Sequence, residues 1–205
     1  MIVDMLVEGD LDEAVARRLI LLTGHQPGVV FGKQGVSYIQ RSLRAFDQRA
    51  RYGNPVLALV DFLDTHLSCP PELPALWLPA RSSRFLLRAV VNEMESWLLA
   101  DRRGIAQLLG LSVALIPQQP EQLTDPKQTL INLARRSPRR KLRNAMVPPP
   151  GVTAAVGPGY TGVMIEFVTK RWSVEGARRL APSLDRCCHR LAELNTLASH
   201  PFVPL

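Results

Sequence analysis

The sequence has few cysteines and no long apolar run, and each absence excludes a class of protein. Its three cysteines, Cys69, Cys187 and Cys188, are odd in number and form no CxxC pair, so they predict neither a disulfide framework nor a zinc site. No apolar run approaches the roughly 18 residues that a membrane span needs. We therefore expect a reduced, cytoplasmic protein that makes no contact with a membrane.

The sequence also lacks the short motifs of several enzyme classes. It has no G-x-S-x-G nucleophile elbow and no Walker motif, which disfavours a serine hydrolase and a built-in ATPase. The first residues, MIVDMLVEGDLDE, contain no basic segment, so we expect no signal peptide. What is present is a globular composition, with 46% hydrophobic and 21% charged residues. The net charge of +7 favours an anionic partner such as nucleic acid.

Short apolar runs alternate with amphipathic segments through the first half of the chain. We predict buried strands over 1–7, 29–31, 56–60 and 85–91, with helices after the first, second and fourth of them. Strands that alternate with helices form a mainly parallel sheet that is covered on both faces. The predicted fold class is therefore α/β.

Composition changes in the middle of the chain, where the predicted strands end and a proline-rich, partly basic part begins. We predict an α/β domain over 1–110 and a mostly helical extension over 111–205 that packs on it. Within the extension, helices are expected over 162–172 and 182–197. The GPGY sequence at 157–160 is expected to form a turn.

Acidic residues follow three of the predicted strands directly. Glu8 follows the first strand, Asp61 the third and Glu93 the fourth. Because the carboxyl ends of parallel strands lie along one edge of a sheet, where such folds bind ligands, we expect these carboxylates to share one crevice. Clustered carboxylates repel one another, and a hard divalent cation removes that penalty. Oxygen-only ligation predicts Mg²⁺ or Mn²⁺ rather than zinc.

Three further acids lie close to these, and their spacing decides whether they join the site. Asp12 falls in the first turn of a predicted helix, so its side chain leans back toward the strand end. Asp61 and Asp64 converge only if the strand ends near Asp61 and the chain turns, because residues three apart lie on opposite faces of a strand. Glu93 and Glu95 share a face in an extended chain but not in a helix, so one of them alone would suffice as a ligand.

A structural role is the simpler interpretation of each acid taken singly. Acidic residues are common at the start of a helix, because its unpaired N–H groups and its dipole favour negative charge there. Three acids at the ends of three strands, however, favour a shared site over three separate helix starts.

At these acids the sequence resembles the TOPRIM fold, the metal-binding domain of topoisomerases, primases and OLD-type nucleases. The resemblance rests on VEGDLDE at 7–13, LVDFLD at 59–64 and NEMESWLLAD at 92–101. The last of these resembles the signature of an uncharacterised bacterial TOPRIM-like family. Further similarities to that family, which extend the resemblance over nearly the whole chain, are DPK at 125–127, GPGY at 157–160 and APSLDRCCHRLAEL at 181–194.

The resemblance implies roles for individual residues. Glu8 matches the invariant TOPRIM glutamate, Asp12 the second acid of the OLD-type pattern, and Asp61 the first aspartate of the D-x-D motif. The sequence departs from that motif at Leu63, so either Asp64 substitutes through a local bulge or metal binding is weakened. The candidate metal ligands are Glu8, Asp12, Asp61, Asp64, Glu93 and Glu95, and the candidate catalytic residues are Glu8, Asp61 and Glu93.

Basic residues supply the remaining candidates. OLD-type nucleases also use a lysine, and the resemblance leaves Lys127 and Lys141 as alternatives for it. The run RRSPRRKLR is expected to contact the nucleic-acid backbone, unless it is only a solvated loop or helix face. Its candidate contacts are Arg135, Arg136, Arg139, Arg140, Lys141 and Arg143.

Together these features predict a Mg²⁺-dependent, nuclease-like phosphodiesterase that acts on DNA or RNA. The resemblance alone implies a role in defence against phage or plasmids. It also supports one alternative, a partner subunit of an OLD- or ABC-type ATPase that is inactive until assembled. The departure at Leu63 supports another, a degenerate TOPRIM domain that binds nucleic acid without cutting it.

Overall fold

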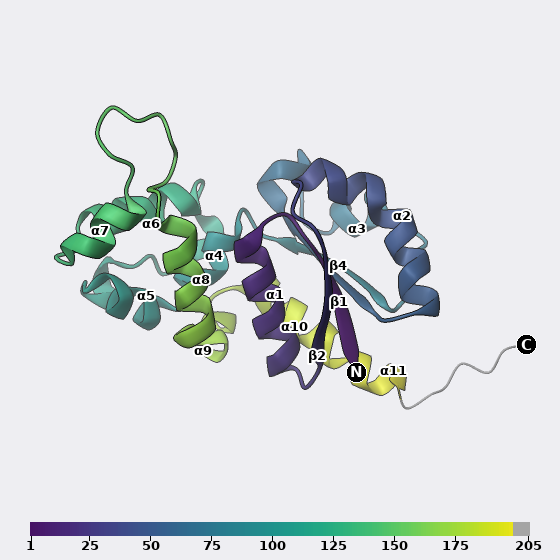
Figure 1. Cartoon of the computed structure of the whole chain (residues 1–205). Coiled ribbons are helices and arrows are strands. Elements are labelled where there is room, and N and C mark those ends of the chain that lie inside the picture. The colour runs from purple at the N-terminus through teal and green to yellow at the C-terminus, as the bar shows by residue number, and fades with distance from the viewer. Residues whose placement is uncertain (199–205) are drawn as a thin grey trace, which may run out of the picture. The chain divides into compact units, whose positions relative to one another are not determined.

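The computed structural model describes residues 1–198 and divides the chain into two compact units (Figure 1). The first unit contains Met1–Ala89 and the segment that begins at Asp185, and the second contains Val90–Leu184. Along the sequence, the second unit is therefore an insertion in the first. This division differs from the predicted boundary near residue 110, because the chain leaves the first unit at the end of its last strand and returns to it much later.

A four-stranded parallel sheet lies within the first unit, which confirms the α/β fold class. Its strands, in the spatial order β2-β1-β3-β4, are β1 (Ile2–Val7), β2 (Gln26–Gly32), β3 (Val56–Asp61) and β4 (Phe85–Val90). The two central strands, β1 and β3, are buried along almost their whole length, as expected of apolar strands in a covered parallel sheet.

Helices cover both faces of this sheet. The helices of the first unit are α1 (Asp10–Leu22), α2 (Val36–Tyr52), η1 (Phe62–Thr65, a 3₁₀ turn), α3 (Glu72–Trp77), α10 (Pro182–Ala192) and α11 (Leu194–Ala198). Figure 1 shows α2 and α3 on one side of the sheet and α1 and α10 on the other. On the first side, Ile39, Leu43 and Phe46 of α2 lie one helical turn apart and pack in one apolar cluster with β3.

A buried carboxylate connects the β2 side of the sheet to a half-exposed arginine of α2. Asp4 of β1 is fully buried; it accepts a hydrogen bond from the Val29 N–H at 3.0 Å and lies 2.9 Å from the Arg49 guanidinium. Asn54 Nδ2 donates to the same carboxylate at 3.2 Å. A Cβ at Gly28 would lie 2.3 Å from Asp4 Oδ1, so only glycine allows β2 this close an approach. Asp4 is thus a structural acid.

The second unit contains helices throughout. They are α4 (Met94–Ala100), α5 (Arg102–Leu109), η2 (Val113–Leu115), η3 (Pro120–Gln122), α6 (Pro126–Arg135), α7 (Arg140–Met146), α8 (Tyr160–Lys170) and α9 (Val174–Arg178). Trp97 of α4 is fully buried, and its indole N–H donates to Ser183 Oγ at 2.7 Å. This hydrogen bond satisfies the polar edge of a large core side chain.

Element boundaries differ from the predicted ones in a few places. The second strand covers Gln26–Gly32 instead of 29–31, and Pro27 is tolerated in it because β2 is an edge strand. The helix predicted over 182–197 is divided into α10 and α11. Among residues 1–198, no helix combines the length and the apolar character needed to cross a membrane.

Candidate functional site

The first two predicted site acids meet at the carboxyl ends of neighbouring strands. Glu8 follows β1, Asp61 is the last residue of β3, and β1 pairs directly with β3. Glu8 Oε1 accepts a hydrogen bond from the Asp61 backbone N–H at 3.0 Å. The two residues are therefore in contact through the Asp61 backbone, and a crevice that their carboxylates share with Glu93 stays a prediction.

Asp12 turns toward the same strand end. It lies in the first turn of α1 and is buried. Its Oδ2 would lie 3.3 Å from a Cβ placed at Gly9, the residue between Glu8 and the helix, so the carboxylate leans back toward the helix start. Glu8, just before α1, and Asp12, in its first turn, therefore both lie near the carboxyl end of β1.

Asp64 lies in a turn that begins directly after β3, as the spacing required. β3 ends at Asp61, and η1 begins at the next residue, so the strand does stop where convergence needs it to. In a 3₁₀ turn, residues three apart lie one above the other. The Asp64 side chain is exposed, as is that of Leu63, which occupies the second position of the D-x-D motif.

A lysine that the sequence patterns did not single out lies at the same end of the sheet. Lys33 directly follows β2, and its N–H donates to the carbonyl oxygen of Val7 at 2.8 Å, so it lies beside the end of β1. Its Nζ is 2.7 Å from Asp10 Oδ1 and 2.5 Å from Glu13 Oε2. The hydrogen bond to Asp10, followed by that to Glu13, raises the pKa of the Lys33 ammonium. The sequence offers only a weak signal for Lys33, a cation two residues after the predicted strand over 29–31.

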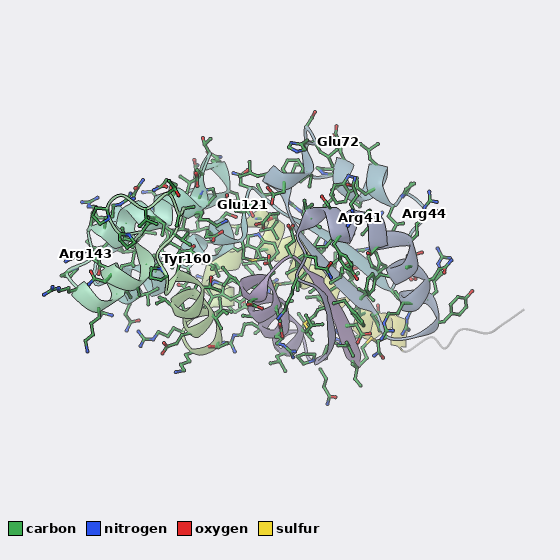
Figure 2. The ribbon with its side chains drawn as sticks, turned by 45° about the horizontal axis from the view of Figure 1, so that its top comes forward. Arg41, Arg44, Glu72, Glu121, Arg143 and Tyr160 are labelled. Atoms are coloured by element: carbon green, nitrogen blue, oxygen red, sulfur yellow. The ribbon has the colours of Figure 1, made fainter. Side chains whose placement is uncertain are left out.

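The other two acids belong to the second unit and are grouped around a lysine. Lys127 Nζ lies 3.7 Å from Glu93 Oε2 and 3.8 Å from Glu95 Oε2. Glu95 is almost fully buried, and its Oε1 accepts a hydrogen bond from the Tyr160 hydroxyl at 2.8 Å. Figure 2 shows the Tyr160 side chain in this helical unit. Glu93 and Glu95 thus lie within reach of one cation, although they are two residues apart at the start of a helix.

Glu93 also has a structural role. Its Oε2 accepts the backbone N–H of Lys127 at 3.2 Å, so it caps the first turn of α6 and not that of α4, the helix it precedes. Burial raises the pKa of the Glu93 carboxyl; Lys127 opposes this, and the neighbouring Glu95 adds to it. Glu93 is therefore harder to ionise than an exposed glutamate.

The two candidate lysines have different surroundings. Lys127 contacts Glu93 and Glu95, whereas Lys141 is exposed on α7 and forms no ion pair with a carboxylate among residues 1–198. The structure thus brings only Lys127 to the predicted acids of the second unit.

The GPGY sequence positions Tyr160 for its contact with Glu95. The N–H groups of Gly157 and Gly159 donate to the carbonyl oxygens of Met146 and Ala145, at 2.8 and 2.9 Å. A Cβ at Gly157 would lie 2.4 Å from the Ala145 carbonyl oxygen, so the close approach requires glycine. The turn predicted here is present, and it leads directly into α8, where Tyr160 is the first residue.

The basic run forms the end of α6, a short turn and α7. Arg139 Nη1 donates to the carbonyl oxygen of Leu108 at 3.0 Å, and Arg143 Nη1 donates to that of Ser137 at 2.7 Å, so these two guanidinium groups support the fold. Figure 2 shows Arg143 on this helical pair. Four other cations of the run are exposed, and within residues 1–198 none of them pairs with a carboxylate: Arg135, Arg136, Arg140 and Lys141.

The side chains at the carboxyl ends of β1 and β3 offer carboxylate oxygens, which are the ligands that a hard divalent cation prefers. No group of three or more acidic, histidine or cysteine side chains able to hold a metal is present among residues 1–198. Mg²⁺ does not need such a group, because it commonly uses one or two carboxylates and completes its shell with water and substrate phosphate oxygens. Glu8 and Asp61 are two acidic residues in contact, joined by the hydrogen bond from the Asp61 N–H to the Glu8 carboxylate.

No protein-family model, curated protein or solved structure matches the chain. The parallel sheet with its covering helices defines the class, α/β, and the resemblance to the TOPRIM fold stays a prediction. Because one fold class hosts many activities, the function is inferred from the residues of the site.

Proposed function

We propose that the protein is a Mg²⁺-dependent phosphodiesterase that cleaves nucleic acid, with its metal at the carboxyl ends of β1 and β3. The observation that supports this most directly is the 3.0 Å hydrogen bond between Glu8 Oε1 and the Asp61 N–H. It brings acids from two separate strands to the place where parallel sheets bind ligands. Mn²⁺ is the alternative ion, because it accepts the same oxygen donors.

Within this proposal, each residue of the first unit has a distinct task. Glu8 and Asp61 hold the ion, with Asp12 and Asp64 next to them. A bound ion of this type lowers the pKa of a water molecule and offsets charge on the phosphate. Lys33, which Asp10 and Glu13 hold beside the end of β1, offers a positive charge to a substrate phosphate.

The helical pair α6–α7 supplies the proposed contacts to the substrate backbone. Arg135, Arg136, Arg140 and Lys141 are exposed, and contacts of this type bind phosphates without regard to sequence. The run contains no aromatic residue, so it offers no platform for stacking single-stranded bases. The proposed substrate is therefore recognised by its charge.

Lys127 is the proposed catalytic lysine. It lies near Glu93 and Glu95 and is partly exposed, so an anionic substrate can approach it. Whether either glutamate also binds the ion stays a prediction, as does assembly with an ABC-type ATPase.

Calorimetry with Mn²⁺ and Mg²⁺, followed by cleavage assays on DNA and RNA, tests the proposal. The wild-type protein should bind the ion and cleave at least one of these substrates. Glu8→Gln should keep the hydrogen bond to the Asp61 N–H but lose the charge, and we expect metal affinity to fall by about tenfold or more. Glu166→Gln, on the exposed face of α8, is the matched control and should behave as wild type.

Two results would contradict the proposal. Undiminished cleavage by Glu8→Gln would remove this residue from the mechanism. Absence of metal binding by the wild-type protein at millimolar concentration, together with retained binding to DNA or RNA, would instead support the non-cutting alternative. If cleavage required a co-purified ATPase, the partner-subunit alternative would be supported.

A further inference from the structure

A cationic pocket lies along β4 in the first unit, and none of its residues belongs to the proposed metal site. Its volume is about 320 Å³. Its polar lining comes from Arg81, Ser82 and Ser83, which precede β4, from Arg88 within β4, and from Arg190 of α10. The segment before β4 lies at the amino ends of the parallel strands, whereas Glu8 and Asp61 lie at the carboxyl ends.

Arg88 is a partly buried cation with three other arginines close to it. Burial lowers the pKa of its guanidinium, and the nearby charges of Arg190, Arg81 and Arg186 lower it further. Cys187 is the nearest group that could carry an opposing charge, but burial raises the pKa of its thiol to about 12. At neutral pH this thiol is uncharged, so it does not balance the arginine.

The neighbouring carboxylates bind groups other than Arg88, although one of them pairs with the pocket residue Arg190. Glu193 pairs with Arg190, and Asp47 accepts hydrogen bonds from Arg51 and from the Ser82 N–H. Within the part of the chain that the structure describes, Arg88 has neither a hydrogen bond nor an ion pair with a carboxylate. Because like charges in a half-buried hollow repel one another, an anion entering it would be bound favourably.

Hydroxyl groups complete the lining. Ser82 Oγ accepts a hydrogen bond from the Arg84 N–H at 3.1 Å, which leaves its own O–H free to donate toward another acceptor. Ser83 is exposed beside it. Guanidinium and hydroxyl donors around one hollow match the several acceptor oxygens of a phosphate group.

We propose that this pocket binds the phosphate group of a phosphorylated ligand, with Arg88 and Arg190 as its cationic contacts and Ser82 as a hydroxyl donor. The volume lies at the lower end of the range for small-molecule sites, about 300–1,000 Å³, and so suits a compact ligand. A free phosphorylated metabolite and the terminal phosphate of a nucleic acid share this chemistry.

Calorimetric titration of the full chain with inorganic pyrophosphate, at low salt and with EDTA present, tests the proposal. Because EDTA removes divalent metal, a failure to bind pyrophosphate would leave the proposed cleavage at the sheet edge unaffected. We expect the wild-type protein to bind and Arg88→Gln to bind about tenfold more weakly or worse. Arg18→Gln, which removes an exposed arginine of α1 outside the pocket, is the matched control and should bind as wild type.

A second variant, at an exposed arginine of the pocket, keeps the test valid if Arg88→Gln fails to fold. Arg190 is exposed, so Arg190→Gln should keep the unfolding temperature and weaken pyrophosphate binding several-fold. Binding should also raise the unfolding temperature of the wild-type protein, and more so than that of either pocket variant. Absence of binding at millimolar pyrophosphate, or equal weakening in Arg190→Gln and Arg18→Gln, would overturn the proposal.

Competition then identifies the source of the phosphate. Displacement of pyrophosphate by adenosine monophosphate, and not by an oligonucleotide, indicates a free phosphorylated molecule. Displacement by a 5′-phosphorylated oligonucleotide, and not by the same oligonucleotide with a 5′-hydroxyl, indicates a nucleic-acid end. Equal displacement by both oligonucleotides would overturn the proposal, because it shows general polyanion binding.

Discussion

Asp4 and Asp10 each pair with a basic side chain, yet their surroundings differ. The Asp4 carboxylate is fully buried in β1 and accepts hydrogen bonds from Arg49, from the Val29 N–H and from Asn54. Asp10, in contrast, is largely exposed. Removing the buried Asp4 carboxylate leaves backbone and amide donors without their acceptor, whereas water replaces an exposed pair such as that of Asp10.

Substitution of these two acids should therefore have unequal effects on stability. Asp4→Ala should lower the free energy of unfolding by about 2 kcal/mol, and Asp10→Ala by about 1 kcal/mol or less. Urea denaturation followed by circular dichroism measures both. Equal losses in the two variants would contradict a structural role for the buried carboxylate.

Glu13 gives a prediction about pH. Burial raises the pKa of its carboxyl, but hydrogen bonds from Lys33 and Arg17 together outweigh this, so its pKa in the folded protein lies below the ordinary 4.5. A carboxyl with a lowered pKa stabilises the folded state above its unfolded pKa, and this contribution is lost as the pH falls through the lowered value. Glu13→Gln should therefore cost about 1 kcal/mol at neutral pH, and this cost should shrink as the pH falls below 4.5 through the lowered pKa.

Denaturation of Glu13→Gln across this pH range measures the effect. Glu166→Gln, which breaks an exposed pair with Lys170, is the control and should show little change at any pH. A stability difference for Glu13→Gln that persists unchanged at low pH would show that charge is not its origin.

Sequence reasoning located some of the site residues and missed others for a physical reason. Glu8 and Asp61 could be placed because strand ends and parallel topology follow from apolar runs. Lys33 could not, since its importance depends on a backbone hydrogen bond to Val7 and on two acids of a different element. The choice of Lys127 over Lys141 likewise needed the packing of α4 against α6.

At the scale of elements, the α6–α7 pair joins two functions in one stretch of sequence. Arg139 and Arg143 use their guanidinium groups to bind carbonyl oxygens within the helical unit. The four remaining cations are exposed to solvent, where salt screens them.

The salt dependence of DNA binding tests whether the four exposed cations contact phosphates. Replacing Arg135, Arg136, Arg140 and Lys141 together by glutamine should reduce the slope of log affinity for DNA against log salt by about 3 to 4, and leave the unfolding temperature unchanged. A control with the same loss of charge on exposed positions of the same unit replaces Arg103, Lys170, Arg171 and Arg179. Equal slopes in the two variants would contradict specific use of this helical pair.

Elements with a strong local signal could be predicted, and those defined by their neighbours could not. The central strands β1 and β3 are apolar except for Asp4 in β1 and the terminal Asp61 in β3, and such runs predict buried strands by themselves. β2 contains Pro27 and Gly28, which disfavour a strand locally, but its edge position and the close approach to Asp4 accommodate both.

At the scale of the whole molecule, the division into units is the feature that composition did not reveal. α10 restores the chain to the first unit, where Cys187, Leu191 and Leu194 are buried and His25 Nε2 lies 2.9 Å from the Leu191 carbonyl oxygen. Contacts between residues more than 160 positions apart leave no local trace in a sequence.

Fragments test this division. A fragment of residues 1–110 lacks α10 and should fail to unfold cooperatively, because only α1 then covers one face of its sheet (Figure 1). Residues 1–89 joined to 185–205 by a flexible linker should unfold cooperatively, as should residues 90–184 alone. Calorimetry compares the three. Cooperative unfolding of residues 1–110 would contradict the division.

The interrupted first unit also has a consequence during synthesis. A ribosome releases the sheet strands first, but α10 emerges only after the whole of the inserted unit has been translated. At 5–20 residues per second, roughly 5 to 20 seconds separate the end of β4 from the arrival of its covering helix. During that interval, the part of the apolar sheet face that α10 later covers is exposed on the nascent chain. Chaperones can bind this surface, and misassembly is most favoured at this stage.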